Sequence, residues 1–115
     1  MKGGAGIMRH WLQLQKPVIT EDAFSGVVKT FVDVVGVDAA IDSLNGREYL
    51  AADREIAGLQ WRITLREIPG ETVEPGWRGV EIDGDTPRVF DLAAVLPSHA
   101  RNELVFAATS GQSQP

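Results

Sequence analysis

Residues 60–66 of the chain read QWRITLR, and apolar and polar side chains alternate there more regularly than in any other segment. Successive side chains of a strand point to opposite faces of a sheet, so Trp61, Ile63 and Leu65 share one face. The polar residues between them take the other face. The alternation runs on to Ile68 and predicts a half-buried strand. We therefore expect a mainly β chain.

The segment before this strand has helical periodicity instead. Asn45 and Glu48 have the spacing of a capping box, in which each side chain bonds the other residue's backbone N–H. Apolar side chains then recur at helical spacing, at Tyr49, Ala52 and Ile56. Gly58 can adopt the left-handed conformation that ends a helix. We expect one helix of about three turns here.

Two β-type segments precede the helix. Residues 10–15 alternate like a strand, and Pro17 is expected to end it. Residues 20–26 are polar and close on a glycine, which indicates a loop. A valine-rich strand is then expected over residues 31–42.

Three more strands are expected after the central one. Pro69 and Gly70 break that strand, and the segment through Gly76 lacks apolar periodicity, which predicts a mobile acidic loop. The later strand-like segments are residues 77–82, 88–95 and 101–108. Asp83-Gly84-Asp85 joins the first two of them and is typical of a hairpin turn.

The predicted elements add up to about six strands and one short helix. An open antiparallel sheet of this size would leave exposed edges, so we expect a small antiparallel β-barrel, SH3-like or sandwich-like, with the helix plugging one end or flanking it. The expected domain is residues 9–108. Residues 1–8 and 109–115 are rich in glycine or small polar residues and are expected to be flexible tails.

Composition narrows the classes of function. The 115 residues fit one domain, and a net charge of -5 argues against a general binder of nucleic acid. No apolar run approaches the roughly 20 residues that cross a bilayer, so no membrane partner is expected. The chain has no cysteine, which excludes disulfides and thiolate metal sites and suits a reducing compartment.

Residues 37–48, which end in Leu44-Asn45-Gly46-Arg47-Glu48, resemble the signature of phage head-tail joining proteins, where a strand ends in a turn that starts a helix. Flanking segments agree with that family in order and spacing. These segments are residues 6–10, 61–66, 89–92 and 103–106. The resemblance covers roughly residues 6 to 108 and is to the head-closure, or stopper, class.

The resemblance implies a structural virion component, assembled in the bacterial host cytoplasm, that is not an enzyme and needs no cofactor. It implies a homo-oligomeric ring of six or twelve subunits in the neck of a tailed phage, a gene transfer agent or a prophage-derived particle. The ring's implied partners are the portal-adaptor complex, the tail terminator or tail tube, and packaged double-stranded DNA passing through the lumen without specific binding. A tail-terminator or tail-tube ring and, from another class, an oligonucleotide-binding small barrel are the alternatives.

Five residues are candidates for the interface with another subunit or partner. Trp11 lies on the polar face of its strand, where a monomer gains little from it. Arg62 and Arg66 share the polar face of the central strand and could pair with acidic residues of a partner, although solvated charges are the simpler interpretation. Arg47 and Glu48 are assigned to a subunit contact by the resemblance alone; capping of the helix is the structural interpretation of Glu48.

A second group of candidates could line or close the channel. Glu71, Thr72, Val73 and Glu74 lie in the acidic loop, and repeated copies of it around a ring would repel DNA phosphates. An ordinary solvated loop is the simpler interpretation. Residues 17–30 are the competing candidate for a gate.

Searches for catalytic and metal-binding patterns find little. His10 and His99 stand alone in sequence, without a carboxylate at ligand spacing. Asp83-Gly84-Asp85 lacks the further ligands of a calcium loop, so we expect neither a metal nor a catalytic site.

Overall fold

A computed structural model describes residues 10–24, 26–51, 58–82, 87–98 and 100–111. Within these residues the predicted mainly β fold, with six strands and one short helix, is confirmed. The elements follow one another as β1 (His10–Asp22), β2 (Gly26–Ser43), α1 (Gly46–Ala51), β3 (Leu59–Arg66), β4 (Arg78–Glu81), β5 (Arg88–Leu96) and β6 (Glu103–Ser110).

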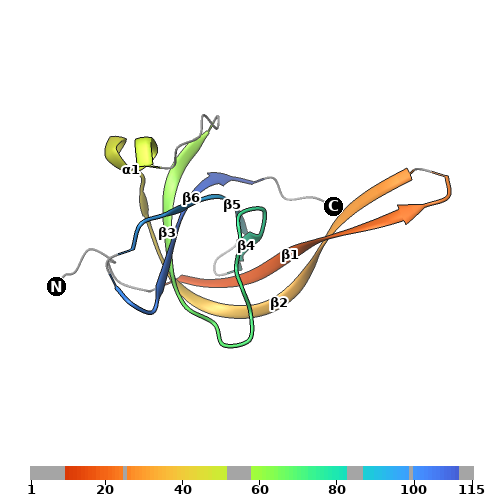
Figure 1. Ribbon diagram of the computed structural model, residues 1–115, viewed down its shortest axis with the longest axis horizontal. Coiled ribbons are helices and arrows are strands. Elements are labelled where there is room, and N and C mark those ends of the chain that lie inside the picture. The colour runs from red at the N-terminus through yellow and green to blue at the C-terminus, as the bar shows by residue number, and fades with distance from the viewer. Residues whose placement is uncertain (1–9, 25, 52–57, 83–86, 99, 112–115) are drawn as a thin grey trace.

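Every strand pairs antiparallel with its neighbours, in the spatial order β1-β2-β3-β6-β5-β4. The short strand β4 also pairs with β1, with Leu12 opposite Glu81, so the sheet closes into a barrel. Figure 1 shows β1 and β2 curving around one side of it, and α1 outside the sheet near the start of β3. Membership of the SH3-like or sandwich-like class stays a prediction.

Apolar side chains from all six strands or their flanks fill the barrel. Its largest fully buried side chains include Phe90, Phe106, Leu12, Leu14, Ile63 and Leu65. A smaller cluster of Ala94, Leu96, Val105 and Ala107 packs with Leu44 and Leu59, the residues that flank α1. Because neighbouring residues of a strand alternate in direction, Ala107 lies on the other face of β6 from Phe106. Leu44, before α1, and Leu59, at the start of β3, are thus held against the outer face of the β5–β6 pair.

The prediction that Pro17 ends the first strand was wrong. β1 continues through Pro17 to Asp22, and β2 already begins at Gly26, where a loop was expected. Proline cannot donate to a ladder and is therefore confined to strands with an open side. β4 pairs with β1 only over Leu12–Gln15, so β1 has one neighbour at Pro17 and the missing N–H is tolerated.

Residues 16–24 and 26–31 consequently form a two-stranded extension, which we call the projecting hairpin. β3 pairs with β2 only over Ala39–Ser43, so beyond the barrel β1 and β2 pair only with each other. Figure 1 shows this hairpin leaving the barrel as a long arm. It accounts for the elongated shape of the molecule, 53 × 31 × 29 Å.

The root of the projecting hairpin is fixed to the barrel by side chains. The Arg78 guanidinium of β4 lies 3.8 Å from the centroid of the Phe31 ring, and the Gln15 amide donates to Asp33 over 2.8 Å. Such cation–π contacts contribute about 0.5 to 2 kcal/mol. Further out, Ile19 and Val27 are 66% and 67% exposed. The hairpin is thus anchored at its base and carries exposed aliphatic side chains further out.

The capping box is confirmed at the start of α1. The Glu48 N–H donates to Asn45 Oδ1 over 2.8 Å, and the Asn45 N–H donates to Glu48 Oε1 over 3.1 Å. The structure describes the helix only through Ala51, and the rest of the predicted three turns lies outside the described residues. Gly58, expected to end the helix, has a positive φ of 83° and directly precedes β3.

The acidic loop is more firmly held than expected. Val73 is buried in the main core, and Gly76 donates its N–H to the Leu92 carbonyl over 2.8 Å. Towards the C-terminus, β6 includes Thr109 and Ser110, which were assigned to a tail, and the Gly111 N–H donates to the Val89 carbonyl. The predicted turn at residues 83–85, the tail at residues 1–8 and the remaining tail at 112–115 lie outside the described residues.

A buried ion cluster joins the three strands at which the barrel closes. Glu81 of β4 is 5% exposed and contacts His10 of β1 through Oε2, while Arg88 of β5 donates to Oε1 from Nε over 2.6 Å. Burial raises the pKa of Glu81, but hydrogen bonds from His10 and Arg88 outweigh it, so the pKa lies below its ordinary value of 4.5. The ionised carboxylate therefore stabilises the closed barrel.

Glu81→Gln is expected to lower the free energy of unfolding near neutral pH by about 2 kcal/mol, because the partly exposed Arg88 guanidinium loses its carboxylate partner. A carboxylate with a lowered pKa contributes stability above its unfolded-state pKa and loses it as the pH falls. Urea unfolding between about pH 7 and pH 3 should show the wild type approaching the variant in acid. The exposed Glu67→Gln is the control and should run parallel to the wild type. A wild-type profile parallel to that of Glu81→Gln would contradict this role.

Candidate assembly interface

Two of the five predicted interface residues lie in a network within the subunit. Arg62 donates from Nη1 to Glu48 Oε2 over 2.7 Å and lies 3.3 Å from Asp42. The hydrogen bond from Glu48 raises the pKa of Arg62, against the effect of burial, and Asp42 adds to the rise. This network ties the start of α1 to β3 and to the end of β2. The structural interpretation therefore accounts for Glu48 and Arg62 without a partner subunit.

The exposed part of this corner is the outer surface of α1. Arg47 is exposed, and Leu50 in the next turn is 79% exposed. Removing a large aliphatic side chain from water is favourable. The exposed Leu50 is therefore a second reason to expect a contact at Arg47. The helical periodicity did not identify Leu50, because Leu50 directly follows Tyr49 and is not part of the apolar face that Tyr49, Ala52 and Ile56 were predicted to form. Whether this surface meets a neighbouring subunit stays a prediction.

Trp11 lies on the outside of the barrel, as its place in the alternation predicted, and is 43% exposed. Its ring packs against the backbone of Gly36 on β2. A Cβ at Gly36 would lie 2.5 Å from Trp11 Cζ2, so only glycine leaves room for the indole. One face of the Trp11 indole thus packs within the subunit. The exposed part of the indole can contact a partner.

Arg66 and the acidic loop meet at one groove. A cavity of about 580 Å³ is lined by Arg66, Glu71, Val73 and Leu104, together with neighbouring loop residues. Arg66, Glu71, Thr72 and Glu74 are all exposed. Val73 is only 7% exposed and packs in the core of the subunit, and a role of the loop in lining a channel stays a prediction. The loop therefore presents its two glutamates to solvent while its valine anchors it.

Sequence spacing failed to identify two features of the surface. His10 looked isolated, but the fold places it against Glu81, which lies 71 residues further along the chain. The projecting hairpin was missed because Pro17 was taken as a strand end. The signal that could have shown it is the β-branched residues on both sides of residue 24, which are Val18, Ile19 and Thr20 before it and Val27, Val28 and Thr30 after it. His99 lies outside the described residues.

The described residues contain no group of three or more acidic, histidine or cysteine side chains that could hold a metal ion. In that same part of the chain, no helix is long and apolar enough to span a membrane. The described surface carries the exposed Trp11, the exposed Ile19 and Val27 of the hairpin, and the exposed Glu71 and Glu74 of the acidic loop.

Gly36→Ala is expected to displace the Trp11 indole, because the added methyl group would overlap the ring. Overpacking of this kind costs about 1 to 3 kcal/mol. The indole N–H resonance of Trp11 should shift and the free energy of unfolding should fall. Gly46→Ala is the matched control, since nothing lies within 4 Å of its Cβ position. Equal stability and an unchanged Trp11 resonance in both variants would show that the ring does not rest on Gly36.

Comparisons with known proteins agree with this architecture. The solution structure of protein SF1141 from Shigella flexneri 2a is similar, with a TM-score of 0.70 and 21% identity over 97% of this chain and 100% of that chain. This likeness concerns the fold. No curated protein matches the chain. The family model described as phage head completion protein matches residues 4–108. The chain therefore belongs to the phage head completion protein family, whose members are structural components of the virion.

Proposed function

We propose that this protein is a ring-forming head-closure protein, which joins the portal-adaptor complex to the tail and retains packaged DNA. Family membership carries the structural role at the phage head. The projecting hairpin is the observation that supports closure. An arm anchored at its root can extend from each barrel into a ring lumen. Several such arms converging on one axis would narrow the channel without any contribution from the barrels themselves.

Charge supports obstruction rather than tight binding of DNA. The chain has a net charge of -5, and affinity for DNA rests mainly on neutralising its phosphates. The hairpin has no net charge, because Lys16 and Lys29 are balanced by Glu21 and Asp22, so it offers no basic face. The same acidity disfavours the oligonucleotide-binding alternative, which needs a basic face.

The projecting hairpin is a better candidate for the gate than the acidic loop. Val73 fixes the loop to the core, whereas the described backbone of the projecting hairpin pairs with no third strand and Arg78 contacts it only at the root. The acidic loop therefore has little freedom to enter and leave a channel. The hairpin can do so by bending beyond its anchored root, where β1 and β2 pair only with each other.

Shortening the hairpin tests this proposal. Val18 and Thr30 are paired, so residues 19–29 can be replaced by Asn-Gly, which forms a two-residue hairpin turn. Particles that carry this variant should assemble and package DNA, yet lose it, because the lumen stays open. Nuclease-protected DNA per particle is the measurement. The full-length variant Glu21→Gln, which changes one exposed hairpin charge, should retain DNA like the wild type.

The outcome separates the candidate roles. Particles that keep their DNA with the shortened hairpin would show that the hairpin does not close the channel. Particles that keep their DNA even when the protein is absent altogether would contradict head closure. In that case, abnormal tail length or loss of tail joining would favour the tail-terminator alternative.

A further inference from the structure

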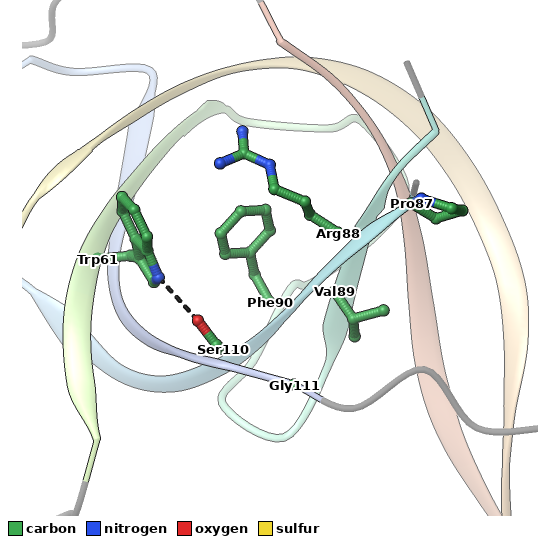
Figure 2. A pocket seen from close by; sticks show the side chains of 7 residues that line it. All are labelled: Trp61, Pro87, Arg88, Val89, Phe90, Ser110 and Gly111. Atoms are coloured by element: carbon green, nitrogen blue, oxygen red, sulfur yellow. Dashed lines mark hydrogen bonds between the residues drawn. The ribbon is translucent and has the colours of Figure 1, made fainter. Parts of the chain in front are cut away.

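A small pocket opens at one end of the barrel, where β3 and β5 begin and β6 ends (Figure 2). Its volume is about 180 Å³, and Trp61, Arg88, Phe90 and Ser110 are among the residues that line it. The Trp61 and Phe90 rings meet edge to face, with centroids 5.9 Å apart. The Trp61 indole N–H donates to Ser110 Oγ over 3.0 Å, which fixes the orientation of the indole. We call this site the mouth pocket.

Arg88 is held in a defined position at this pocket. Figure 2 shows its side chain extending over Phe90 towards Trp61, and its guanidinium carbon lies 5.2 Å from the Phe90 centroid. Nε and Nη2 both contact Glu81 Oε1, at 2.6 and 2.5 Å. The Arg88 side chain remains 46% exposed despite these contacts. A fixed and partly exposed guanidinium is suited to bind a second carboxylate, because its planar fork matches carboxylate geometry.

Besides holding the seam of the barrel, the buried Glu81 fixes the position of Arg88. Burying a carboxylate costs several kcal/mol, and apolar side chains of similar volume often replace such ion pairs without loss of stability. Glu81 nevertheless lies in a barrel whose other inward side chains are mostly apolar. It orients Arg88 and shares its charge with His10, which is cationic when protonated. Glu81 thus both joins the strands at the seam and holds the Arg88 guanidinium at the mouth pocket.

The size of the mouth pocket limits the ligand. Small-molecule pockets are usually about 300 to 1,000 Å³, so 180 Å³ suits a single side chain. Tryptophan and arginine are also the residues that most often dominate protein interfaces. The site therefore fits an acidic side chain, with its methylene groups against the aromatic rings and its carboxylate at Arg88.

The same molecule displays such side chains at the other end of the barrel. Glu71 and Glu74 are exposed on the acidic loop that follows β3. β3 begins at Leu59, lines the mouth pocket with Trp61 and ends at Arg66, just before that loop. A strand rises about 3.3 Å per residue, so the five steps from Trp61 to Arg66 span roughly 17 Å. A loop held to the core by Val73 cannot reach its own pocket.

We propose that the acidic loop of one copy binds the mouth pocket of the next, with Glu71 or Glu74 paired to Arg88. The two surfaces differ and lie at opposite ends of the barrel, so the contact is head-to-tail. Head-to-tail contacts generate closed rings when the rotation between copies closes. The inference rests on the proposed ring and identifies the contact that builds it.

Reciprocal charge reversal tests the contact. One variant carries Arg88→Glu, and the other carries Glu71→Arg with Glu74→Arg. Each variant alone should raise the concentration needed for ring formation at least about tenfold, because like charges then meet at the interface. An equimolar mixture should recover rings in which the two variants alternate. Native mass spectrometry gives the composition of each ring.

The mixture also provides the control for folding. Both variants are first compared with the wild type by circular dichroism and by urea unfolding. If folded variants form rings of wild-type size on their own, the loop does not bind the pocket, although the proposed ring stands. If folded variants fail alone and also fail when mixed, the pairing is wrong. If the wild type itself forms no ring, the proposed function fails before the contact is tested.

A second experiment covers the case in which Arg88→Glu does not fold beside the buried Glu81. The chain has no cysteine, so a Pro87→Cys and Glu74→Cys double variant introduces the only two thiols. Pro87 is exposed at the pocket rim. Oxidation of assembled protein should give a ladder up to the full ring, whereas each single variant can give only dimers. A Pro87→Cys and Gln60→Cys variant is the matched control. An equal ladder in the control, or none in the test variant, would overturn the proposal.

Discussion

Closure of the barrel depends on β4, a strand of four residues that pairs with β1 on one side and β5 on the other. A Cβ at Gly79, in the middle of β4, would lie 3.0 Å from Leu12, so the strand packs closely over the core. At its end, Glu81 contacts side chains of both neighbouring strands. A short strand offers few backbone hydrogen bonds, and the buried ion cluster adds side-chain contacts at the same seam.

The length of β4 also determines how the rest of the molecule is arranged. β1 and β2 are far longer than the strands that flank them in the barrel. The parts that have no third strand beside them pair with each other and leave the barrel together. Exposed strand edges usually favour association with other chains. The projecting hairpin has two such edges, and aliphatic side chains as well. In the proposed ring, neighbouring subunits would cover part of these surfaces.

Much of the fold followed from the sequence because local rules and packing agreed. Trp61, Ile63 and Leu65 alternate as a barrel strand, and Asn45 and Glu48 form the predicted capping box. The rule that failed concerned Pro17, because its effect depends on whether the strand has a second neighbour, which only the fold decides. The His10–Glu81–Arg88 cluster was equally inaccessible, since it joins residues far apart in the chain. The signature residues 44–48 identified the phage head role. Only the structure shows that two of the candidate contact residues, Glu48 and Arg62, are already paired within the subunit.

The central claim is that this small acidic barrel works as a ring. Mass photometry or native mass spectrometry of the purified protein at micromolar concentration, alone and with the portal-adaptor complex, tests it most directly. The account predicts a closed ring with a single defined number of subunits, six or twelve, that associates with the complex. A protein that stays monomeric under both conditions would contradict it.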